Sequence, residues 1–179
     1  MTSLPTDTRR FAEFLRYAAL AGIVIVVLSW GWTVLDPQRL ADARAEELGL
    51  DRVGAALGPG ARILLLVMAA LSGAAVIATL IPAARLCRAY SRDAALSVEA
   101  AAAISGIGCG LVAQAAMGVL RRTGDTLALT LGAPAGERTL ALGFGSTDLG
   151  LALAASLMLM IGLVMRQAVD IARDNAGFV

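Results

Sequence analysis

The sequence predicts an all-α membrane protein in which four transmembrane helices form a bundle, within one integral membrane domain covering residues 1–179. Apolar residues make up 58% of the chain, charged residues make up 16%, and the mean hydropathy is +0.76. A typical soluble domain is about 45–50% apolar and about 25% charged. Four runs of about 17 to 22 residues contain no charged residue, and as helices they match a hydrocarbon core of about 30 Å. These spans are residues 17–35, 63–84, 100–120 and 149–165.

The first span is interpreted as a retained transmembrane helix. Arg9–Arg10 followed by an apolar run is also typical of a signal peptide, with Ala41–Ala43 as the cleavage site. The apolar region of a signal peptide is about 7–15 residues long, which is shorter than this run. The run also contains Trp30 and Trp32 near its end, as expected for aromatic residues at a membrane interface. A cleaved signal is the alternative.

A short surface helix is predicted after the first span, at about residues 37–48. Asp36 is a candidate N-cap, Pro37 suits the first helical position, and Gly49 can end the helix. Glu46 and Glu47 are interpreted as part of its solvated face.

Small residues in the second, third and fourth spans predict close contacts between helices. Gly106 and Gly110 lie four residues apart in the third span, a spacing that lets helix backbones approach in lipid. Ser97 is a plausible N-cap for this helix. Gln114 is the most polar side chain within the spans, and we expect it to make an interhelical hydrogen bond, with a ligand contact as the alternative.

A small β-hairpin is predicted at about residues 126–144, on the outer face of the membrane. Leucines alternate with Ala and Thr before a Pro134–Gly136 turn, and apolar residues alternate again after it. A period of two on both sides of a turn is typical of a hairpin. Ser146 or Thr147 is the candidate cap of the fourth span.

The composition excludes several chemistries. The chain has no His, and all 15 basic residues are Arg. It therefore has no lysine for a phosphate-binding loop or a Schiff base, no histidine for a nucleophile pair and no histidine metal ligand. A net charge of +1 does not favour direct nucleic-acid binding. We expect no enzyme activity, no catalytic residue, no metal and no cofactor.

Two segments carry a resemblance to a known family. They are the connection from Arg85 to Glu99 and the C-terminal end from Ala168 to Val179. With four spans and a Pro-Ala-Gly turn, they resemble the bacterial membrane family known as domain of unknown function 2975. The residues that match its motifs are Tyr90, Ser97, Glu99, Asp174, Asn175, Phe178 and Val179. Leu96 stands where an aromatic residue is usual, and Ala100 stands where Asn is common.

The resemblance implies little about chemistry, because the family has no established activity. Its members are often encoded beside small helix-turn-helix regulators, which implies sequestration or control of such a regulator at the membrane. It also implies the bacterial cytoplasmic (inner) membrane as the location. From the arginines and loop lengths we expect a multi-pass topology with both termini in the cytoplasm.

The function predicted from these observations is binding of a protein partner, through the cytoplasmic connection and the tail or through helix faces. The alternatives are an accessory subunit of a larger membrane complex and, less favoured because no span carries a charge, a small-solute transporter or channel. A further alternative is that the arginines only anchor helix ends at lipid phosphates of the bilayer. The candidate partner-facing residues are Arg85, Arg88, Arg92, Glu99, Asp174, Asn175 and Phe178.

Overall fold

The structure is a computed structural model in which every described regular element is an α-helix. It describes residues 6–49, 57–92, 94, 96–130, 143 and 145–176. The helices are α1 (Thr6–Leu35), α2 (Pro37–Glu47), α3 (Pro59–Ser91), α4 (Val98–Thr130) and α5 (Ser146–Ala176).

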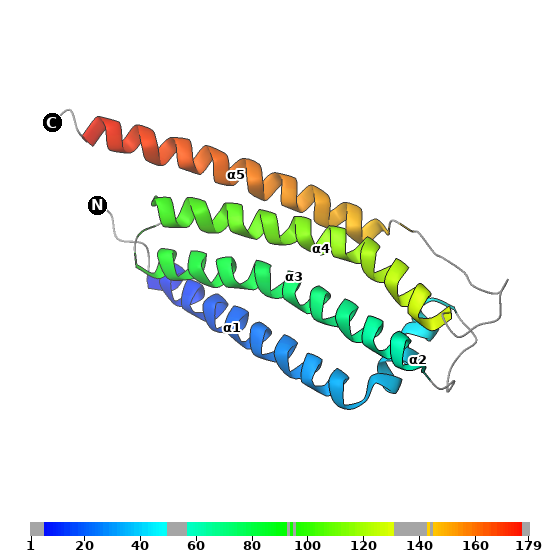
Figure 1. The fold of residues 1–179 in the computed structure, drawn as a ribbon. Coiled ribbons are helices and arrows are strands. Elements are labelled where there is room, and N and C mark those ends of the chain that lie inside the picture. Colours follow the sequence, from blue (N-terminus) through cyan, green and yellow to red (C-terminus); the bar gives the residue numbers. More distant parts are fainter. Residues whose placement is uncertain are drawn as a thin grey trace.

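The four long helices lie side by side in the order α1, α3, α4, α5 (Figure 1). Each packs against its neighbour in this row, and among the described residues α1 and α5 do not contact each other. The predicted four-helix bundle is therefore present as an open layer, with α1 and α5 at its two edges. The layer has two broad faces, and large apolar side chains cover much of the surface that these faces expose.

The predicted spans lie within these four helices, which are long and apolar enough to cross a membrane. The helices extend beyond the uncharged runs. The 33 residues of α3, at 1.5 Å each, are about 50 Å long, so its charged ends reach past a hydrocarbon core of about 30 Å.

The layer has two ends with different contents (Figure 1). The terminal end carries the start of α1, the end of α5 and the connection between α3 and α4. The opposite end, which we call the α2 end, carries α2, the C-terminal end of α4 and the start of α5.

Small residues bring the long helices close together, as the sequence predicts. A Cβ atom added to Gly110 of α4 would lie 2.7 Å from Thr79 Cα of α3, and one added to Gly162 of α5 would lie 3.0 Å from the backbone nitrogen of Ser105 of α4. Real Cβ atoms essentially never lie as close to backbone as 2.7 Å, and 3.0 Å is tighter than most such contacts, so glycine allows this close approach of the helix backbones.

The surface helix α2 forms with the predicted caps. Asp36 accepts a hydrogen bond from the backbone N–H of Arg39 at 3.2 Å, and Pro37 occupies the first helical position. Gly49 has φ +66°, the left-handed conformation that ends many helices. The Ser97 hydroxyl likewise accepts from the Ala100 N–H at 3.1 Å at the start of α4, which confirms that cap.

The predicted hairpin at about 126–144 is wrong in its first strand. Residues 126–130 continue α4, and Ala128 and Leu129 are buried in a cluster with residues of α2 and α3. Leu127 is 38% exposed, so the alternating leucines do not share one buried face. The hydroxyls of Thr126 and Thr130 donate to carbonyls one turn earlier, which satisfies them within a helix. Residues 131–142 and 144 lie outside the described part of the chain.

Candidate functional site

A buried carboxylate organises the α2 end. Asp125, near the C-terminal end of α4, is 3% exposed. Its Oδ2 atom lies 3.4 Å from Nε of Arg44 on α2 and 3.3 Å from a terminal nitrogen of Arg121, one turn earlier on α4. Burying a charge is costly unless it is paired and hydrogen-bonded. The two guanidiniums meet this requirement and join α2 to α4.

Glu47 extends this cluster toward solvent. Its carboxylate accepts from Arg121 at 3.1 Å and also pairs with Arg44 on its own helix. The hydrogen bond from Arg121, aided by Arg44, lowers the pKa of the Glu47 carboxyl from 4.5 to about 2, against a smaller opposing effect of burial. Glu47 is exposed on α2, as predicted, with a side chain that is 49% exposed, but it also pairs with two arginines.

A second buried carboxylate joins α4 to the start of α5. Asp148 is 5% exposed. Its Oδ2 atom lies 3.0 Å from Arg122 and accepts from the backbone N–H of Gly145 at 2.7 Å. This carboxylate caps α5 from its third residue, so the prediction that Ser146 or Thr147 supplies the cap is wrong.

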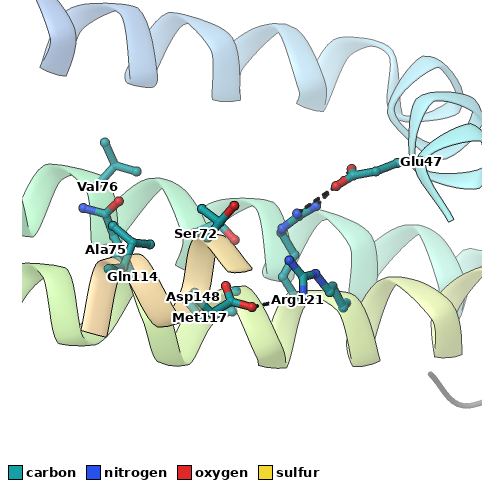
Figure 2. Close-up of a pocket in the computed structure, with 12 residues that line it drawn as sticks. Glu47, Ser72, Ala75, Val76, Gln114, Met117, Arg121 and Asp148 are labelled. Carbon is teal, nitrogen blue, oxygen red and sulfur yellow. Dashed lines mark hydrogen bonds and ion pairs between the residues drawn. The ribbon is translucent and has the colours of Figure 1, made fainter. Parts of the chain in front are cut away.

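A cavity of about 290 Å³ opens beside these pairs (Figure 2). Glu47 and Arg121 line it toward the α2 end, and Asp148 lies along its wall. Gln114 lines it deeper in the layer and donates to the Thr79 hydroxyl of α3 at 2.7 Å. This contact confirms the predicted interhelical hydrogen bond.

The clustered charged groups of the α2 end are neutralised among themselves, whereas Arg39, Glu46 and Arg62 lie outside the cluster and are exposed. Three guanidiniums face three carboxylates in the pairs described above. Among the described residues, no buried side-chain nitrogen or oxygen lacks a hydrogen-bond partner. No group of His, Cys, Asp and Glu side chains suitable for a metal occurs in the part of the chain that the structure describes. Ion pairs join α2 to α4 and α4 to α5. Little uncompensated charge remains in this cluster to bind a ligand.

The described residues among those predicted to face a partner lie at the terminal end. Arg85, Arg88 and Arg92 are exposed in the last turns of α3 and directly after it. Glu99 is exposed in the first turn of α4, and Asp174 is exposed near the end of α5. Asn175 belongs to α5 but its side chain is not described, and Phe178 lies outside the described residues.

The structure brings only some of these residues together. Arg85 and Arg88 line one groove with Arg16 of α1, whereas α3 and α5 do not contact each other over their described residues. Among the described side chains, Arg85, Arg88, Arg92, Glu99 and Asp174 make no ion pair. The arginines therefore keep their charge available at this end.

Sequence reasoning missed Arg16 and the whole cluster at the α2 end. The spacing of Arg121 and Asp125, four residues apart, was a usable signal, because such residues share one helix face. The predicted hairpin at about 126–144 hides this signal, because it places Arg121 and Asp125 in a connection and not on a helix. No pattern in the sequence indicates that α2 supplies the other half of the cluster.

Comparison with known proteins found no match, whether the chain was scanned against protein-family models or compared with curated proteins or solved structures.

Proposed function

We propose that this chain is a non-enzymatic integral membrane protein that binds a protein partner at its terminal end. The observation that carries the proposal is the contrast in pairing. Arg85, Arg88 and Arg92 lie close together in the chain, are exposed and make no ion pair among the described residues, whereas Arg44, Arg121 and Arg122 of the α2 end are paired and, of the described arginines there, only Arg39 and Arg62 are exposed.

Two helical extensions make the terminal end accessible. The end of α5 continues about 11 residues past the uncharged run that ends at Met165, about 16 Å at 1.5 Å per residue. The end of α3 continues past Ala84 to Ser91. Both extensions leave the hydrocarbon region where a soluble protein could reach them. The α3 extension presents arginines, and the α5 extension presents charged side chains of both signs.

The partner that fits this surface carries acidic groups opposite the arginines and basic or amide groups opposite Glu99 and Asp174. Arginine suits such a contact, because its planar guanidinium binds a carboxylate through two hydrogen bonds. In keeping with the family resemblance, we propose a small helix-turn-helix regulator held at the cytoplasmic face of a bacterial inner membrane. Both termini would then lie in the cytoplasm.

The test uses two double variants that conserve net charge. Arg92→Glu with Asp174→Arg reverses two exposed charges at the terminal end, and Arg39→Glu with Glu46→Arg does the same on the exposed face of α2. We expect affinity purification from gently solubilised membranes to recover a specific protein with the wild type and the α2 variant, and to lose it with the terminal-end variant. Equal recovery with both variants would contradict the proposal.

An accessory subunit of a larger membrane complex is a second candidate, favoured by the open layer. No contact between α1 and α5 exists among the described residues, so both edge helices have a face that another membrane protein could cover. Native electrophoresis in mild detergent separates the two functions. A large stable membrane assembly supports the subunit role, and a lone monomer or dimer argues against it.

A further inference from the structure

Three arginines from two helices line one groove at the terminal end. Arg16 of α1 and Arg85 and Arg88 of α3 surround a groove of about 190 Å³. The rest of its lining is apolar and consists of Leu20 and Ile23 of α1 with Ile81 and Ala84 of α3. The groove thus has a basic part and an apolar part.

The basic part has no described counter-charge. Among the described residues, none of the three arginines makes an ion pair. Glu13 lies one turn before Arg16, but its carboxylate pairs with Arg9 at 3.7 Å. Guanidiniums that line one groove carry like charges, so an anion bound in the groove would be stabilised by them.

The depth of the groove in the membrane follows from the spans. Arg16 directly precedes the uncharged run that begins at Tyr17, and Arg85 directly follows the run that ends at Ala84. Both arginines therefore lie at the boundary between hydrocarbon and headgroups. Phosphates of the bilayer lie at this level. The apolar lining of the groove comes from within the two uncharged runs, which places it toward the acyl chains.

We propose that this groove is a binding site for an anionic phospholipid, whose phosphate lies among Arg16, Arg85 and Arg88. The upper part of an acyl chain packs on Leu20, Ile23 and Ile81. Basic pockets between transmembrane helices are suited to anionic headgroups. A free phosphate would satisfy the guanidiniums equally well, but it would leave the apolar lining without a partner, which favours the lipid. This proposal does not depend on a protein partner, for which Arg92, Glu99 and Asp174 outside the groove remain exposed.

The test measures lipid binding by native mass spectrometry of the purified full-length chain in detergent, with phosphatidylglycerol and, as a neutral comparison, phosphatidylcholine of the same chain lengths. The groove variant carries Arg16→Gln, Arg85→Gln and Arg88→Gln. A control variant removes three exposed arginines that do not line the groove, through Arg39→Gln, Arg62→Gln and Arg166→Gln. The two variants have the same net charge.

We expect phosphatidylglycerol to bind the wild type more tightly than phosphatidylcholine. The groove variant should lose affinity for phosphatidylglycerol on the order of 100-fold, counting about fivefold for each arginine near an anionic headgroup. The control variant should change by less than about threefold. An equal loss in both variants, or no preference for phosphatidylglycerol in the wild type, would overturn the proposal.

Two further measurements separate the lipid from a free anion. Ala84→Trp fills the apolar part of the groove without changing its charge, and we expect it to weaken phosphatidylglycerol binding at least tenfold. Inorganic phosphate at millimolar concentration should not displace the lipid. Displacement by inorganic phosphate, or unchanged lipid binding in a folded Ala84→Trp variant, would contradict the lipid assignment.

Discussion

The two ends of this protein differ in that, among the described residues, only the α2 end has a cluster of buried, paired charges. At the α2 end, Asp125 and Asp148 are 3% and 5% exposed, and each lies within hydrogen-bonding or ion-pair distance of at least one guanidinium. At the terminal end, Arg85, Arg88 and Arg92 are exposed, and no described carboxylate pairs with them. A buried charge must find its partner within the protein, whereas an exposed charge can be satisfied by water and remains available to another molecule.

The largest expected effect comes from removing the central carboxylate of the α2 end. Asp125→Ala removes the buried carboxylate that pairs with Arg44 and Arg121 and leaves them only the carboxylate of Glu47, and the loss of hydrogen bonds between charged groups typically costs about 2–3 kcal/mol. We expect a loss of this size in the free energy of unfolding, measured by denaturant titration in detergent. Asp174→Ala, at an exposed position of the terminal end, should change it by less than about 0.5 kcal/mol. Similar losses of unfolding free energy in both variants would contradict the claim that the α2 end depends more on its charges than the terminal end.

A smaller effect is expected at the start of α5. Asp148→Ala removes the ion pair with Arg122 and the cap on the Gly145 N–H, and we expect it to cost about 2 kcal/mol. Asp170→Ala removes an exposed carboxylate of the same helix near the terminal end and should have almost no effect. Hydrogen exchange in the first turns of α5 is the direct measurement. Unchanged protection there in Asp148→Ala would show that the cap is dispensable.

The effect of pH on the free energy of unfolding, through Glu47 at the α2 end, is expected to be smaller still. The pKa of Glu47 is lowered from 4.5 to about 2 in the folded chain, so this carboxylate stabilises the fold fully above pH 4.5. Its contribution is lost as the pH falls through about 2. Because the side chain is 49% exposed, solvent screening limits the effect.

The measurement is a series of unfolding titrations between pH 5 and pH 2. Glu47→Gln should reduce the loss of stability across this range, whereas Glu99→Gln at the terminal end should keep the wild-type profile. Trp30 lines a cavity that it shares with Leu40 and Arg44 of α2, so tryptophan fluorescence reports on release of this helix. A wild-type profile in Glu47→Gln would contradict the assigned pairing.

The smallest expected effect lies between the two ends. Gln114→Leu removes the hydrogen bond to Thr79, and such bonds between transmembrane helices average about 0.6 kcal/mol. We expect a loss of this size in the free energy of unfolding, with the same loss in Thr79→Val and in the double variant. Additive losses would show that the two side chains act independently.

The spans were predictable because charged residues are excluded from hydrocarbon, so each span is an uncharged run in the sequence. The caps by Asp36 and Ser97 were predictable for a similar reason, because a cap is a contact between residues three apart. The end of α4 was not predictable from local pattern. Residues 126–130 alternate like a strand, yet burial of Ala128 and Leu129 against α2 and α3 stabilises the helical form.

The candidate site was predictable at one end only. Exposed arginines beside an uncharged run are visible in the sequence, so Arg85, Arg88 and Arg92 were found. The cluster around Asp125 depends on Arg44, which lies far away in the chain and meets it only after α2 has packed on α4. The contribution of Arg16 to the lipid groove depends in the same way on the packing of α1 against α3.

The most direct test of the difference between the ends is site-specific photo-cross-linking in intact cells. One photoreactive side chain replaces Leu96, which is 73% exposed at the terminal end, and another replaces Glu46, which is exposed on α2. We predict that the group at position 96 captures a discrete protein, that Arg92→Glu with Asp174→Arg abolishes this capture, and that position 46 captures none. Capture at position 46 with none at position 96 would contradict the account.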